Sequence, residues 1–220
     1  MSDAQKMLQT VQAGDLAGVK QLLAADPGLV NARSANGISA ILLAVYHGHQ
    51  AIVELLLASK PELNVFEAAA AGQVERLKTW IESDAGLVNS YSADGWTPLH
   101  LAAFFGHEPC AVQLVANGAL LNALSKNSNG NTPLHAAVVN RKLDMVKFLL
   151  GAEADVNLPT QFGWTALHLA AHGGSREMIE TLMMFGADAK AKNDKGQTAL
   201  EIARERGHQQ VAELLAQYSG

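Results

Sequence analysis

The stretch GWTPLH, residues 95–100, decides the fold because the chain repeats it at regular intervals. It returns as GNTPLH at 130–135 and as GWTALH at 163–168, and a weaker form, GQTALE, lies at 196–201. The last three copies follow one another at intervals of 33 residues, and a fixed period of this length is the signature of a repeat array. We therefore expect a row of similar structural units.

The residue types within the stretch predict where a helix begins and ends. Thr97 is suited to accept a hydrogen bond from a free backbone N–H at a helix start, and Pro98 has no N–H to lose there. Ala102 is small enough to let a neighbouring helix approach, and Gly106 tolerates the left-handed conformation that ends many helices. A second apolar stripe with helical spacing follows in each unit, as at 145–150. Each unit is therefore predicted to be a pair of helices.

The stretch DGWTPLHLAAFFGH, residues 94–107, with its following apolar helix and NGALLNAL, resembles the ankyrin repeat. The resemblance covers nearly the whole chain and implies an all-α ankyrin-repeat solenoid, in which antiparallel helix pairs stack and short β-hairpin fingers project. One pair cannot bury its own apolar face, so stability comes from contacts between neighbouring units. We expect a single domain, 1–220, with these approximate units: 1–33, 34–60, 61–92, 93–127, 128–161, 162–194 and 195–220.

Two places depart from the repeated pattern. Residues 14–64 overlay on residues 72–122, so the N-terminal part looks like a two-unit block that occurs twice. The third unit joins directly to Asn64 and leaves no room for a finger, so we expect the row of fingers to be interrupted near residue 65. In the fifth unit Glu153 takes the place of the glycine that ends the second helix elsewhere, which predicts a strained or differently capped helix end.

Charge and composition argue against several classes of protein. The formal net charge is -5, whereas proteins that bind the nucleic-acid backbone are usually basic. No Lys/Arg cluster offers a patch for an anionic membrane, and no apolar run approaches the roughly 20 residues of a membrane span. The single cysteine, Cys110, cannot form an intrachain disulfide, and the polar first residues lack a signal-peptide core. We expect a cytoplasmic protein that binds neither nucleic acid nor membrane.

The histidines raise the question of a catalytic or metal site. His47 and His49 lie close together but lack the converging Cys or carboxylate partners that zinc needs. Cys110 and Trp80 take positions that other apolar core residues fill elsewhere, so we expect both in the core. No nucleophile elbow, P-loop or dinucleotide fingerprint occurs, so we expect no enzyme, no catalytic residue, no metal and no cofactor. The histidines of two recurring slots, which we interpret as structural, are His49, His100, His107, His135, His168 and His208.

The slots that differ between units are the candidates for recognition. In ankyrin-repeat proteins, the family this chain resembles, partners usually bind the concave groove formed by the fingers and by the two residues that follow the paired alanines. The aromatic residues in these slots are typical anchors of a protein interface, although the alternative remains that they only pack on neighbouring fingers. The predicted partner-binding residues are Tyr46, His47, Asp94, Trp96, Phe104, Phe105, Asn131, Val139, Asn140, Phe162, Trp164 and His172.

These features favour non-catalytic recognition of another protein, as an adaptor, scaffold or inhibitor, through an aromatic-rich concave groove of a monomer. A second hypothesis places a small-ligand or metal site with weak or no catalysis in the groove, using His47 or His172. A third is self-association through the groove. The longer connection at 125–130 is either a tolerated surface insertion or a finger that reaches the partner.

Overall fold

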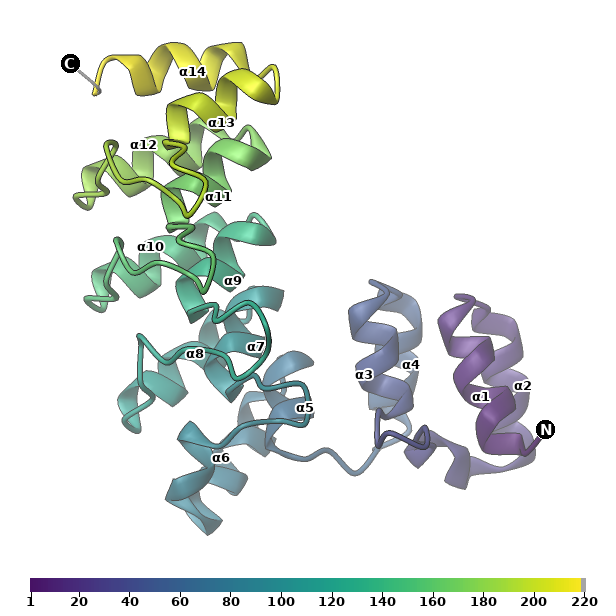
Figure 1. The fold of residues 1–220 in the computed structure, drawn as a ribbon. Helices are drawn as coiled ribbons and strands as arrows, with labels where there is room; N and C mark the ends of the chain where they lie inside the picture. The colour runs from purple at the N-terminus through teal and green to yellow at the C-terminus, as the bar shows by residue number, and fades with distance from the viewer. Residues whose placement is uncertain (219–220) are drawn as a thin grey trace.

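The computed structural model describes residues 1–218, which form a row of paired helices (Figure 1). The helices alternate between an inner and an outer row, and two short 3-10 helices, η1 (Pro27–Asn31) and η2 (Ala85–Asn89), follow outer helices. The inner helices are α1 (Asp3–Gln12), α3 (Ala40–Tyr46), α5 (Val65–Ala70), α7 (Pro98–Phe105), α9 (Pro133–Val139), α11 (Ala166–Gly173) and α13 (Ala199–Glu205). The outer helices are α2 (Leu16–Ala25), α4 (Gln50–Ala58), α6 (Val74–Ser83), α8 (Glu108–Ala116), α10 (Leu143–Gly151), α12 (Arg176–Met184) and α14 (Gln209–Ala216).

The repeated Thr starts an inner helix, as its sequence position predicts. The Thr97 hydroxyl accepts the backbone N–H of His100, and the Thr97 N–H donates in turn to Nδ1 of His100 at 3.2 Å. Such a reciprocal pair satisfies two backbone donors that a helix start would otherwise leave free. Units that lack the T-P-L-H stretch reach the same result with other residues, as Asn64 and Glu67 do at the start of α5.

Small and branched apolar side chains fill the space between the helices. Alanines of the inner helices, such as Ala102 and Ala103, are fully buried, and so are large residues of the outer helices, such as Leu114 and Leu149. Cys110 is fully buried among them, and burial raises the pKa of its thiol to about 11. The prediction that Cys110 is a core residue is therefore confirmed.

The fingers are hydrogen-bonded turns rather than regular strands. In the fourth unit the Ser92 N–H donates to the carbonyl of Trp96 at 2.8 Å, and the Gly95 N–H donates to the carbonyl of Ser92 at 2.9 Å. Within residues 1–218, an isolated bridge joins Arg33 to Ser39 in the finger of the second unit. The helical, solenoid character of the prediction is confirmed.

The row of units is interrupted where the sequence predicts the loss of a finger. Residues 60–64 run without helix or turn from α4 directly to Asn64, which caps α5. Figure 1 shows α1 to α4 (the N-terminal block) standing beside the lower end of the longer stack from α5 to α14 (the C-terminal block). Arg33 in the finger of the second unit spans the junction and forms a two-pronged ion pair with the buried Glu67, at 2.7 and 3.0 Å.

The outer helices α8 and α10 are each followed by a residue in the left-handed conformation, and the type of that residue differs between them. Gly118 takes the left-handed conformation after α8 with φ +84°, which glycine adopts without strain. Glu153 occupies the equivalent place after α10 with φ +72°. A residue with a Cβ is strained in this region by roughly 1 to 2 kcal/mol. The expected strain at this helix end is therefore present.

The prediction that Trp80 belongs to the core is wrong. Its side chain is 39% exposed on the outer helix α6. The indole N–H donates to the carbonyl of Leu63 at 2.7 Å. That carbonyl belongs to the extended segment that replaces a finger, so the missing finger changes the surroundings of this tryptophan.

None of the helices in residues 1–218 combines the length and hydropathy that crossing a bilayer requires.

Candidate functional site

Four aromatic side chains from two different blocks form one continuous group. Tyr46 contacts Phe105 with 5.6 Å between ring centroids, Phe105 contacts Phe104 at 5.0 Å, and Phe104 contacts Trp96 at 5.3 Å. The last two pairs are edge-on, the geometry that aromatic rings prefer. Tyr46 is 41% exposed and the other three are half-buried. We call these four residues the aromatic cluster.

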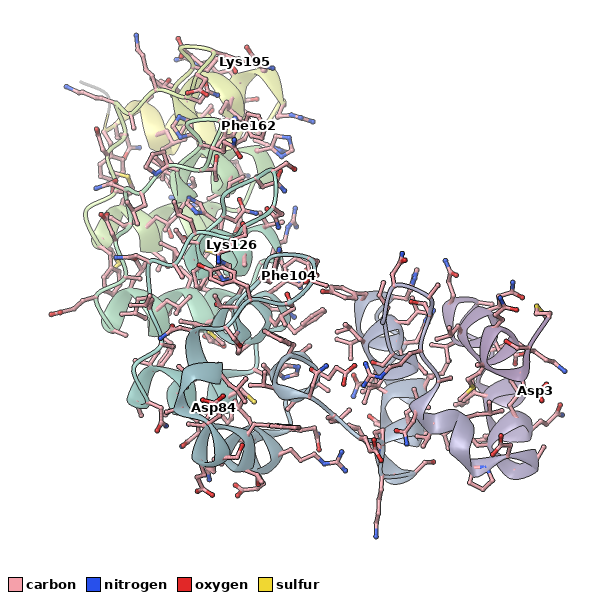
Figure 2. The ribbon with its side chains drawn as sticks, turned by 60° about the horizontal axis from the view of Figure 1, so that its bottom comes forward. Asp3, Asp84, Phe104, Lys126, Phe162 and Lys195 are labelled. Carbon is pink, nitrogen blue, oxygen red and sulfur yellow. The ribbon has the colours of Figure 1, made fainter. Side chains whose placement is uncertain are left out.

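The ends of two inner helices and one finger position the cluster. Phe104 and Phe105 are the last residues of α7, and Figure 2 shows Phe104 on the side of the C-terminal block that faces the N-terminal block. The side-chain amide of Asn140, from the next unit, donates to the carbonyl of Phe104 at 2.6 Å. Trp96 precedes the helix cap and lies over the imidazole of His100, with 5.7 Å between centroids. Neighbouring units thus hold the cluster in place.

Tyr46 also connects the two blocks through its hydroxyl. It donates to the Asp94 carboxylate at 2.9 Å, and this carboxylate accepts a second, short hydrogen bond from the hydroxyl of Ser92. Burial, and then the neighbouring Asp94 charge, raise the pKa of Tyr46, so the hydroxyl stays protonated and keeps donating at neutral pH.

A second, smaller aromatic group lies two units further along the stack. Trp164 contacts His172 edge-on at 5.6 Å, and Phe162 and Val139 are each 53% exposed. Within the part of the chain described, no ring contact links this group to the aromatic cluster. Figure 2 shows Lys126, Phe162 and Lys195 following one another along the C-terminal block. The sequence pattern therefore separates into two anchor regions, the aromatic cluster and a second region formed by Phe162, Trp164 and His172 of the sixth unit with Val139 of the fifth.

The remaining predicted residues have structural contacts of their own. The carbonyl of Asn131 accepts the Nε2–H of His100 at 2.8 Å, and the Asn140 amide is held by Phe104 as described. His47 is exposed and stacks on His49, with 5.7 Å between centroids. Sequence reasoning missed the Tyr46–Asp94 bond, because nothing in the pattern relates residues of separate blocks. The assignment of these residues to partner binding stays a prediction.

The histidines at the starts of inner helices are arranged for structure. Nδ1 of His100 accepts from Thr97, so the proton lies on Nε2, which donates to the next unit. Burial lowers the pKa of His100 and of His135 to about 4 in each case. Both rings are therefore neutral at pH 7. His168 makes the same contacts with Thr165 and with the carbonyl of Gln197.

The surroundings of His172 bear on the hypothesis of a small-ligand or metal site in the groove. His172 lies in a recess of about 380 Å³ together with Val139, Arg141 and His208, and burial lowers its pKa. The polar side chains in the lining of the recess are those of Arg141, His172, Ser175 and His208. Among residues 1–218, no three His, Cys, Asp or Glu side chains gather as they would around a metal ion.

Comparison with protein families gives matches along most of the chain. Residues 65–160 and 152–220 match a family described as "Ankyrin repeats (3 copies)". Residues 36–66 match a family described as "Ankyrin repeat". The matches fall on the helix pairs and fingers described above.

Several curated proteins are similar to this chain over part of their length. The "Target of rapamycin complex 2 subunit AVO2" of Saccharomyces cerevisiae is 28% identical over 165 residues, 70% of this chain and 38% of that protein. The "E3 ubiquitin-protein ligase XBAT33" of Arabidopsis thaliana is 27% identical over 194 residues, 72% and 38%. "Ankyrin repeat and SAM domain-containing protein 6" of Rattus norvegicus is 34% identical over 101 residues, 46% and 11%. The chain thus spans less than two fifths of each.

Proposed function

Because the chain belongs to the ankyrin-repeat family, we propose that it is a non-catalytic module that binds another protein on the aromatic cluster. Ankyrin repeats are protein–protein interaction modules, and their units serve mainly to build a binding surface. The chain acts as an adaptor, scaffold or inhibitor, according to what its partner does.

The observation that carries this proposal is the joined, half-exposed aromatic cluster. Its side chains are not part of the helix caps, and Tyr46, Phe104 and Phe105 lie at the ends of inner helices where other units have Val139 and Asn140. Large aromatic side chains on a rigid surface are the commonest energetic anchors of protein interfaces. Neighbouring units already hold these rings in place, so a partner would meet a surface with little ordering cost.

The second anchor region supports a partner that extends along the stack. Trp164 and Phe162 present apolar surface two units beyond the cluster, and the fifth unit between them adds Val139 beside the polar Asn129, Asn131 and Asn140. A partner that contacts both regions would bury two apolar centres and a polar strip, which is the usual composition of a specific interface.

Cysteine content and charge bear on where the protein acts and on what it binds. We place the protein in the cytoplasm because its single cysteine, which is buried, suits a reducing compartment. We expect it to be monomeric and to bind neither nucleic acid nor membrane, since its net charge is -5. The names of two relatives, a complex subunit and a ubiquitin ligase, describe proteins that work with other proteins.

Affinity capture with matched variants tests the proposal. The wild-type chain and a Trp96→Ala/Phe105→Ala/Trp164→Ala variant are used as baits in native lysate, and retained proteins are identified by mass spectrometry. The control is a Val112→Ala/Leu120→Ala/Met184→Ala variant, because these side chains are 40%, 60% and 84% exposed and lie outside both anchor regions. Circular dichroism and thermal unfolding establish that all baits are folded.

The proposal predicts a protein that wild type and control retain and the aromatic variant loses. A protein retained equally by all three baits would mean that the aromatic residues are structural and that the binding surface lies elsewhere. A protein lost only with the control variant would place binding outside the two anchor regions.

A further inference from the structure

Neighbouring fingers are joined to one another by backbone hydrogen bonds. In each case the donor is the N–H of the second residue of a finger's turn. The acceptor is a carbonyl at the tip of the preceding finger. The bonds are Lys126 to Gly95 at 2.8 Å, Gln161 to Asn129 at 2.9 Å, and Asp194 to Phe162 at 3.3 Å. A finger therefore offers one donor toward the preceding unit and one acceptor toward the next.

Because the third unit has no finger, the donor of the fourth finger has no carbonyl of a preceding finger to bind. Ala93 is the residue of the fourth finger that corresponds to Lys126, and within the part of the chain described its N–H has no hydrogen-bond partner. Ala93 borders a cavity of about 280 Å³ between the second finger, α3, the start of α5 and the fourth finger. We call this cavity the notch.

The lining of the notch combines apolar and acidic side chains. Ile38, Leu42 and Phe66 supply apolar surface, and Ile38 is 38% exposed. Glu67 and Asp94 also line it, whereas no Lys or Arg does. Arg33 neutralises Glu67, so the exposed Asp94 carboxylate supplies the negative charge that a visiting group would meet.

We propose that the notch receives a loop of a partner protein, which enters as a substitute for the missing finger. The inference rests on the proposed function and names the segment that is recognised. A carbonyl of the loop accepts the Ala93 N–H, an apolar side chain lies against Ile38, Leu42 and Phe66, and a Lys or Arg faces Asp94. Recognition of backbone by an unpaired edge, with side chains in adjacent pockets, is an established way of binding a peptide segment.

The walls of the notch are already fixed before a loop arrives. The ion pair of Arg33 with Glu67 ties the second finger to α5, and the bond of Tyr46 with Asp94 ties α3 to the fourth finger. A preformed site reduces the ordering cost of binding. Tyr46 belongs to both the aromatic cluster and the lining of the notch, so the two are continuous.

A single substitution removes the proposed donor. Ala93 is the second residue of the turn Ser92–Gly95, a position that favours proline, so Ala93→Pro deletes the N–H and keeps the turn. Ala35 has the same place in the turn Ser34–Gly37 of the second finger. By analogy with the other fingers, the Ala35 N–H faces the first unit, and Ala35 does not line the notch. Ala35→Pro is therefore the matched control.

The probe is a displayed library of disulfide-closed loop peptides of random sequence, selected against the wild-type chain. We expect the selected loops to share an apolar residue and a Lys or Arg. Their affinity should fall about tenfold with Ala93→Pro and stay unchanged with Ala35→Pro. Asp94→Asn, which can still accept from Tyr46, should weaken the loops about fivefold and reduce their salt dependence.

An exchange measurement guards against a turn that is disturbed by proline. In the wild-type protein, a selected loop should slow hydrogen exchange of the Ala93 amide and leave the Ala35 amide unchanged. Loops that bind Ala93→Pro as tightly as wild type and leave the Ala93 amide unprotected would overturn the inference. A library that yields no loop above background would overturn it as well.

The same variants separate this inference from the proposed function. A captured partner that is lost with the aromatic variant but retained by Ala93→Pro would overturn the notch and leave the proposed function standing. A partner lost with Ala93→Pro but retained by the aromatic variant would support the notch and contradict binding on the aromatic cluster.

Discussion

Buried histidines at the starts of the inner helices use one or both ring nitrogens for the fold. In the fourth unit, Nδ1 of His100 accepts from Thr97 and Nε2–H donates to the next unit. In the fifth unit, Nδ1 of His135 makes the same contact with Thr132, but its buried Nε2 has no hydrogen-bond partner among the described residues. These rings stabilise the fold in their neutral form, since burial disfavours the charged one.

The lowered histidine pKa values predict a loss of stability in mild acid. Burial lowers the pKa of His100 and His135 from 6.5 to about 4. As pH falls through 6.5, the unfolded chain takes up protons that the folded chain does not, so each histidine removes about 1.4 kcal/mol per pH unit until pH about 4. Urea unfolding at pH 7, 6 and 5 measures this slope.

The control for this prediction is His100→Gln/His135→Gln. Glutamine can still cap the helix, as Gln5 does beside Ser2. The double variant should be less stable at pH 7 but should lose less stability between pH 7 and pH 5. Equal slopes for the two proteins would mean that these histidines do not carry the acid sensitivity.

The left-handed conformation of Glu153 predicts a stabilising substitution. Glu153→Gly relieves the strain of a Cβ at φ +72°. The greater freedom of glycine in the unfolded chain offsets part of this gain, so the free energy of unfolding should rise by about 1 kcal/mol. Glu153→Ala removes the same charge but keeps the Cβ, so it should give no such gain. Chemical denaturation compares the three proteins, and a gain of equal size for both variants would show that charge is the cause.

At the scale of elements, a histidine at the start of an outer helix joins one unit to the preceding one. Nε2 of His107 lies 3.0 Å from the carbonyl of Ala70, at the end of the preceding inner helix, and His49 and His208 make the corresponding contacts. The imidazole of His107 packs directly over Gly72, where a Cβ would lie 2.6 Å from Nδ1. This close approach explains why glycine and histidine occur together at such boundaries.

The contact predicts that two glycines with similar backbone conformations respond differently to alanine. Gly72 and Gly118 have φ of +68° and +84°, but a Cβ on Gly118 would have nothing within 4 Å. Gly118→Ala should therefore cost only the conformational strain, about 1 to 2 kcal/mol. Gly72→Ala should cost roughly 1 to 3 kcal/mol more, because the ring must move. Equal losses in thermal or chemical unfolding would contradict the proposed packing role of His107.

At the scale of the whole molecule, the junction between the two blocks depends on few polar contacts. The side chain of Glu67 is 2% exposed and pairs with Arg33 of the other block, whose side chain is 38% exposed. Removal of one partner of a buried ion pair leaves an uncompensated charge, whereas removal of both is tolerated better.

This asymmetry predicts that the double variant is more stable than Arg33→Gln alone. Arg33→Gln leaves the Glu67 carboxylate buried without its cation and should cost about 2 kcal/mol, allowing for the partial exposure of Arg33. Arg33→Gln/Glu67→Gln should cost less than Arg33→Gln alone. Equilibrium unfolding of the wild type, both single variants and the double variant measures the coupling, and a double variant that is the least stable would contradict it.

The sequence predicts local features of the units better than contacts between the two blocks. The Thr97 caps, the strain at Glu153 and the missing finger before Asn64 follow from local pattern, because each depends on a few adjacent residues. The Tyr46–Asp94 bond and the exposure of Trp80 depend on how the two blocks meet, and no repeated residue encodes that angle. The two anchor regions could be predicted as slots, but their separation follows only from the stacking of units.

Tryptophan fluorescence shows directly whether a partner covers the aromatic surface. The chain has three tryptophans, and Trp80 lies apart on α6, so a Trp80→Phe variant reports only Trp96 and Trp164. Quenching by acrylamide is measured with and without a saturating amount of the captured partner. We expect quenching to fall on binding and the tryptophan emission to shift to shorter wavelength. Unchanged quenching at saturation would mean that the partner binds elsewhere.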